Sequence, residues 1–100
     1  MSLFQPPTIY PFFDNRILIS WELEQPFNIP PLINITIMLQ GNPPLTFDPP
    51  QSNVIKISEM NKNQIIINWV VKKPKIKTII KLILSCETIN EEQELIYSPS

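Results

Sequence analysis

The twelve prolines constrain the fold of this 100-residue chain more than any other feature of its sequence. Proline lacks a backbone N–H and clashes with the preceding turn of a helix, so helix interiors and central β-strands exclude it. The prolines therefore mark loops, and regular structure has to form in the intervals between them. They stand at positions 6, 7, 11, 26, 30, 31, 43, 44, 49, 50, 74 and 99.

The residues between the prolines favour strands over helices. Isoleucine occurs eighteen times, whereas alanine is absent. Isoleucine is branched at Cβ and fits a pleated surface, while alanine is the best helix former. The composition therefore predicts an all-β protein.

Apolar and polar residues alternate between the proline groups, which is typical of half-buried strands. We expect strands over residues 16–24, 32–40, 53–58, 64–72, 76–87 and 93–97, with short further strands near 8–10 and 45–47. Turn residues are expected at 40–44, 59–63, 73–75 and 88–92. Six to seven antiparallel strands at this spacing predict an immunoglobulin-like β-sandwich in a single domain over residues 1–100. Such a domain can stand alone or be one module of a longer protein.

Two tryptophans share the apolar parity of their strands. Trp21 aligns with Ile17 and Ile19, and Trp69 aligns with Ile65 and Ile67. We expect both rings in the core between the sheets, as in other sandwiches. The alternative is a platform for carbohydrate or peptide, which requires exposed rings.

The sequence lacks the residues that most catalytic sites need. It has no histidine, which removes the usual general base and the commonest metal ligand, and its single glycine cannot form a phosphate-binding loop. Cys86 has no partner for an internal disulfide and no histidine to activate it. It shares the parity of Leu82 and Leu84, so we interpret it as a small buried hydrophobe. We therefore expect no enzyme activity, no cofactor and no metal ion.

The charged residues form one basic and one acidic group, and the formal net charge is −1. The basic group is either a patch for an anionic partner, such as a phospholipid head group or nucleic acid, or a set of lysines that prevents edge-to-edge strand pairing. Since it lacks interleaved aromatic residues, nucleic acid is not the expected partner. The basic group is Lys72, Lys73, Lys75, Lys77 and Lys81, and the acidic group is Glu87, Glu91, Glu92 and Glu94.

The carboxylates suggest plain surface more than a site. The acidic group has no calcium-loop spacing, so we expect a solvated turn. Glu22 and Glu24 lie on one face of a strand, which imitates a paired-carboxylate site but is the ordinary pattern of a solvent-facing strand. An enzyme using carboxylates alone remains a hypothesis on these two residues.

No targeting or membrane-spanning segment is expected. The first residues do not combine a basic stretch with a long apolar run, so they do not resemble a signal peptide. The longest apolar-rich stretch, 76–86, is interrupted by Lys77 and Lys81 and is too short to span a bilayer. We expect no membrane insertion, and the compartment, cytoplasm or cell surface, stays open.

Several apolar residues fall on strand faces that should be solvated, among them Leu18 and Val54. Four others form an apolar surface rimmed by lysines, provided that their two strands are neighbours, and such a surface indicates an interface. The alternative is a β-bulge that shifts the parity and buries some of them. The predicted interface residues are Ile66, Val70, Ile79, Ile83, Lys77 and Lys81.

The order of segments between Ile17 and Glu87 resembles a known group of modules. A tryptophan strand is followed by Ile33–Ile37, a proline-rich loop with Leu45-Thr46-Phe47, and the long strand around Trp69. This pattern is similar to the immunoglobulin-like modules of the CARDB type and to the appendage (ear) subdomains of clathrin-adaptor subunits. It departs where Met60–Asn63 replaces a glycine-containing turn, which asparagine tolerates.

The resemblance implies a non-catalytic module for adhesion, spacing or peptide capture, and it carries over no site residues. We expect a protein-interaction module that docks a partner through an outer apolar sheet face or an edge strand. The partner is another protein, a neighbouring domain or a second copy. The alternative function is a structural spacer or adhesion module within a larger cell-surface or extracellular protein.

Overall fold

The chain folds into strands connected by loops, confirming the all-β prediction. The computed structural model describes residues 5–24, 35–57, 64–86 and 90–99, and within these ranges there is no helix. The seven strands are β1 (Thr8–Phe12), β2 (Arg16–Glu24), β3 (Ile35–Asn42), β4 (Val54–Ile57), β5 (Gln64–Lys72), β6 (Thr78–Ser85) and β7 (Asn90–Tyr97).

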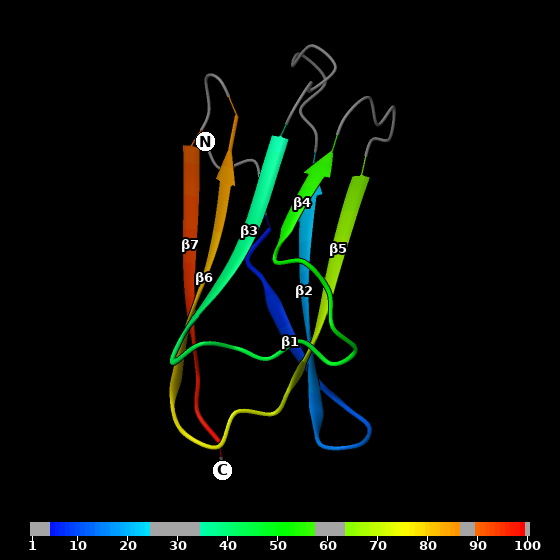
Figure 1. The fold of residues 1–100 in the computed structure, drawn as a ribbon. Helices are drawn as coiled ribbons and strands as arrows, with labels where there is room; N and C mark the ends of the chain where they lie inside the picture. Colours follow the sequence, from blue (N-terminus) through cyan, green and yellow to red (C-terminus); the bar gives the residue numbers. More distant parts are fainter. Residues whose placement is uncertain (1–4, 25–34, 58–63, 87–89, 100) are drawn as a thin grey trace.

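The strands form two antiparallel sheets that pack face to face as a sandwich (Figure 1). One sheet has the order β1-β2-β5 and the other the order β4-β3-β6-β7. The molecule is elongated along the strands, with extents of 42 × 24 × 18 Å. The lower end in Figure 1 holds the β1–β2 turn, the β5–β6 loop and the end of β7.

The core lies between the sheets and is built from the alternating apolar positions of four strands, β2, β3, β5 and β6. Trp21 and Trp69 are 1% and 0% exposed, so the core prediction is confirmed and the exposed-ring alternative is wrong. Because side chains alternate between the two faces of a strand, each buried residue is followed by one that faces solvent. The buried apolar residues are Ile17, Ile19, Trp21, Ile35, Ile37, Leu39, Ile65, Ile67, Trp69, Val71, Ile80, Leu82 and Leu84.

Two predicted turns are wrong in part because strand pairing continues through them. Gly41 and Asn42 belong to β3, where Gly41 lies opposite Ile80 of β6. Glu91 and Glu92 belong to β7 and pair with β6, so the acidic turn predicted over 88–92 is a strand from Asn90 on, and its first two residues lie outside the described ranges. In both places the neighbouring β6 supplies backbone partners, which outweigh the local turn preference.

The turn between β1 and β2 is tight, because only three residues separate Phe12 from its partner Arg16. Asp14 and Asn15 both have φ of 58°, in the left-handed region. Aspartate and asparagine tolerate this region better than other non-glycine residues. The Asp-Asn pair therefore permits the reversal without glycine.

The single glycine is required by packing. A Cβ added at Gly41 would lie against Leu45 Cγ and 2.9 Å from the carbonyl oxygen of Pro43. Leu45 packs against the core, so it cannot move freely to make room. We expect Gly41→Ala to lower the free energy of unfolding by about 1–3 kcal/mol, as overpacking does. Urea denaturation measures this.

The matched control is Gln40→Ala in the same strand, since the Gln40 side chain is exposed. It should change the free energy of unfolding by less than about 0.5 kcal/mol. Equal stability of Gly41→Ala and the parent chain would contradict the packing argument.

Candidate functional site

The predicted interface residues are divided between the two sheets. Ile66 and Val70 lie on β5 of the three-stranded sheet, whereas Ile79 and Ile83 lie on β6 of the four-stranded sheet. Since each pair points away from the core, the two pairs face opposite sides of the sandwich. The condition for one apolar surface, neighbouring strands, is not met. The residues between β5 and β6 cross from one sheet to the other instead of forming a hairpin.

The alternation of inward-facing and outward-facing side chains is not shifted by a bulge in these strands. The pairing of β2 with β5 and of β6 with β7 runs without interruption over every residue of the strands. The bulge alternative is therefore wrong for this set. Ile66 is 57% exposed, and Val70, Ile79 and Ile83 are half-buried by their neighbours on the outer faces.

The outer face of the four-stranded sheet has apolar rows separated by charge. Met38 lies between Val54 and Ile83 in one cross-strand row, and Ile79 lies beside Ile96 in another. Between the two rows stands Lys81, whose Nζ is 3.4 Å from Glu92 Oε1. The ion pair interrupts the apolar surface, so this face is a mixed one.

The outer edge of β5 carries a distinct feature, because a loop segment pairs with only one end of it. The Lys72 N–H donates to the Thr46 carbonyl at 2.9 Å, and the Asp48 N–H donates to the Val70 carbonyl at 3.1 Å. Phe47 thereby forms an isolated antiparallel bridge with Val71. The predicted short strand over 45–47 exists as this single bridge.

The rest of this edge has no pairing partner among the described residues. Alternate residues of a strand direct their backbone N–H and C=O groups to the same edge. The backbone groups of Ile66 and Asn68 therefore face the same edge as those of Val70 and Lys72. No described residue makes a backbone hydrogen bond to Ile66 or Asn68 on that side. From Gln64 to Val71 the strand also carries no charged side chain. We call Gln64–Asn68 the free β5 edge.

The other three edge strands each carry a feature that discourages further pairing. Pro11 removes an N–H from β1, and β4 is four residues long with Lys56 exposed. The edge strand β7 carries Glu91, Glu92 and Glu94. Proline, shortness and charge are the usual protections of a sheet edge. The free β5 edge lacks all three.

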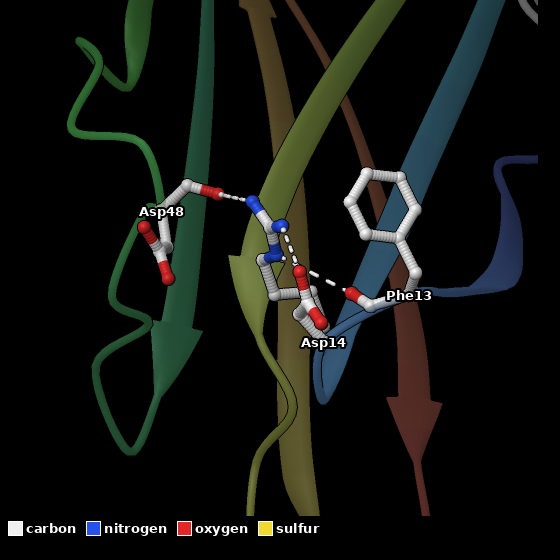
Figure 2. Close-up of polar contacts among 4 residues, drawn as sticks. Phe13, Asp14 and Asp48 are labelled. Carbon is white, nitrogen blue, oxygen red and sulfur yellow. Dashed lines mark hydrogen bonds and ion pairs between the residues drawn. The ribbon is translucent and has the colours of Figure 1, made fainter.

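A second candidate surface lies at the end of the sandwich where Arg16 links three segments. Its Nε donates to the Phe13 carbonyl at 3.3 Å, and its Nη1 donates to the Asp48 carbonyl at 3.2 Å. Its Nη2 lies 3.3 Å from Asp14 Oδ2, as Figure 2 shows. The guanidinium also stands over the Phe13 ring, 4.9 Å from its centroid, and Phe12 stacks on Phe13.

Most of the basic group gathers at this same end. The Lys73 N–H donates to the Asn15 carbonyl at 2.9 Å, which holds the β5–β6 loop against the β1–β2 turn. Lys81, in contrast, lies on the outer sheet face and pairs with Glu92. We call the surface formed by Phe13, Lys72, Lys73, Lys75, Ile76 and Lys77 the basic end.

The remaining candidate residues form no site in the described part of the chain. Cys86 is a free thiol, partly buried and packed against the core, in line with its interpretation as a small hydrophobe. Glu87 and the side chain of Glu24 lie outside the described residues. Among described residues, no three His, Cys, Asp or Glu side chains gather in a way that could hold a metal ion.

Over the described ranges, no helix has the length and apolar character needed to cross a membrane. The chain matches no protein-family model, no curated protein and no solved structure.

Sequence reasoning missed the free β5 edge and the exposed pair Phe13 and Ile76. The lack of charge over 64–71 signals an unprotected edge only once β5 is known to be an edge strand. Asp14-Asn15 is a turn signal that places Phe13 at a tip. The contact between that tip and the β5–β6 loop depends on the sheet order, which local sequence does not encode.

Arg16 should stabilise the fold through its bonds to two backbone carbonyls. Its side chain is 16% exposed, whereas that of Asp14 is 77% exposed, so the ion pair itself contributes little. We expect Arg16→Met to lower the free energy of unfolding by about 1–3 kcal/mol, measured by urea denaturation.

Arg16→Lys is the matched variant, since it keeps the charge but cannot reach both carbonyls with a planar fork. It should recover less than half of the loss. Full recovery by lysine would show that charge, and not the two-carbonyl contact, is the stabilising element.

Proposed function

We propose that this protein is a non-catalytic interaction module that docks a partner strand at the free β5 edge, and that the partner it fits best is a second copy. The observation that carries this proposal is the bridge of Phe47 to Val71, because it stops where the strand still has backbone groups that no described residue pairs with. Added strands commonly bind such edges through main-chain hydrogen bonds.

A second copy fits the edge by symmetry. In an antiparallel pair around a two-fold axis, residues opposite each other exchange both backbone hydrogen bonds when both point outward. Centring the axis on Ile66 places Ile66 opposite Ile66 of the second copy and Gln64 opposite Asn68. The segment Thr46–Asp48 of each copy then lies beyond the paired stretch.

Side-chain chemistry also favours self-pairing at this edge. The two-fold axis brings no like charges together, since Gln64–Val71 is uncharged. It also brings two Ile66 side chains, each 57% exposed in one copy, side by side on the outer face. Cross-strand apolar pairs of this kind stabilise sheets. The same operation on β7 would oppose carboxylates.

The strand order supports the immunoglobulin-like character of the module. Strands one, two and five form one sheet and strands three, six and seven the other, as A, B, E and C, F, G do in an immunoglobulin domain. The fourth strand pairs with the third here instead of the fifth. This order fits the proposed likeness to CARDB-type and adaptor-ear modules, which act by binding.

A spacer or adhesion role within a larger protein is the second candidate, favoured by where the described chain enters and leaves. The Gln5 N–H donates to the Glu22 carbonyl near one end of the long axis. Ser98 and Pro99 follow Tyr97, which pairs with Thr78 at the opposite end (Figure 1). Entry and exit at opposite ends suit a module strung in a row.

Self-association is tested by sedimentation equilibrium and light scattering over a range of protein concentrations. The parent chain should reach twice the 11.6 kDa mass of one copy as concentration rises. Ile66→Lys should stay monomeric, because the two-fold axis would oppose two ammonium groups at an uncharged edge. A parent chain that stays monomeric at the highest soluble concentration would contradict the proposal.

Ile96→Lys is the matched control, since Ile96 is 54% exposed on edge strand β7 of the other sheet. It should dimerise like the parent chain. If Ile66→Lys still dimerises, or if only Ile96→Lys loses dimerisation, the interface does not lie at β5. Circular dichroism checks that both variants keep the parent fold.

A further inference from the structure

The two most exposed large apolar side chains among the described residues stand at the same end of the sandwich. Phe13 is 65% exposed on the β1–β2 turn, and Ile76 is 62% exposed on the β5–β6 loop. The hydrogen bond from Lys73 N–H to Asn15 carbonyl joins these two loops. Figure 1 shows both loops at the lower end, beyond the ends of the sheets.

Lysines surround the two apolar tips. Four of them lie in or beside the β5–β6 loop, all are exposed, and no described carboxylate forms an ion pair with any of them. The nearby acids are Asp14, which pairs with Arg16, and Asp48. The four lysines are Lys72, Lys73, Lys75 and Lys77.

The glutamates of the described chain lie farther up the strands, so the molecule is polarised along its axis. Glu94 lies opposite Lys81 in the register of β6 and β7. This position is three residues along β6 from the Thr78–Tyr97 pair, with which the pairing begins at the basic end. Glu22 lies toward the opposite end of β2. A chain with a net charge of −1 therefore presents a locally positive end.

Hydrogen bonds to backbone carbonyls position the loops that carry Phe13 and Ile76. Arg16 fixes the Phe13 carbonyl and the loop at Asp48, and Thr78 Oγ1 donates to the Ile76 carbonyl at 2.9 Å. A concave pocket of about 170 Å³ opens between the two proline-containing loops, and Lys72, Lys73 and Lys75 are among its lining residues. The end thus combines apolar tips, cations and a small basic hollow.

We propose that the basic end docks on the surface of a bilayer rich in anionic phospholipid. Phe13 and Ile76 enter the interface between head groups and acyl chains, and the lysines contact the lipid phosphates. Exposed apolar residues and basic residues each add to such binding, and neither alone gives stable attachment. The contact is peripheral and needs no spanning segment. It uses residues separate from the free β5 edge, so either proposal can fail alone.

The test is co-sedimentation of the purified chain with vesicles of phosphatidylserine and phosphatidylcholine, compared with vesicles of phosphatidylcholine alone. The parent chain should pellet with the anionic vesicles, much less with the neutral ones, and less as salt is raised. Failure to pellet with anionic vesicles at low salt, or equal binding to both kinds, would overturn the proposal.

Two sets of variants separate charge from insertion. Lys73→Glu with Lys75→Glu should lower partitioning to anionic vesicles by about tenfold or more. Ile76→Ser, alone and with Phe13→Ser, should also lower it, and the single variant guards against misfolding at the Phe13 stack. Lys56→Glu and Val54→Ser on β4 are matched controls that should bind like the parent chain.

The apolar variants also discriminate between a membrane and a soluble polyanion. If the lysine variants lose binding while both apolar variants keep parental binding, the basic end serves a soluble acidic partner and the bilayer proposal is wrong. If the β4 controls lose binding to the same extent as the tip variants, the contact is spread over the surface and the proposal is also wrong.

Discussion

The burial of one alternating face from each sheet is the interaction on which the rest of the structure depends. Ile19, Trp69 and Ile37 are fully buried between the sheets, and each lies on a strand whose intervening residues face outward. Burial fixes the register, because a shift of one residue would turn the apolar face of a strand to solvent. The position of every outward-facing group, including Ile66 and the loop tips, follows from that register.

Sequence alone predicted the strands best where apolar and polar residues alternate without interruption between two groups of prolines. The bounds expected for 16–24 and 64–72 are those of β2 and β5, since both runs alternate without interruption. Prediction failed at Gly41 and Glu91, where β6 supplies a pairing partner that no local pattern reveals. It also failed to show that β5 and β6 belong to different sheets, and this divided the expected interface.

The two proposed surfaces are an unpaired sheet edge and a group of loops at one end of the sandwich. A seven-stranded sandwich of two open sheets has four edge strands, and among them β5 has the longest run without proline or charge, Gln64–Val71. The crossing of the chain from β5 to β6 places lysines and Ile76 beside the β1–β2 turn. The edge provides backbone hydrogen-bonding groups, whereas the basic end provides charge and apolar tips, so they suit chemically different partners.

Docking of a strand at β5 requires that its edge from Gln64 to Asn68 is uncovered in a single copy. Amide hydrogen exchange, resolved by residue in dilute monomeric protein, tests this most directly. We expect rapid exchange at Ile66 and Asn68 and slow exchange at Ile67 and Trp69, whose amides face β2. Equal protection of all four amides in the monomer would contradict it, because the edge would then already be covered.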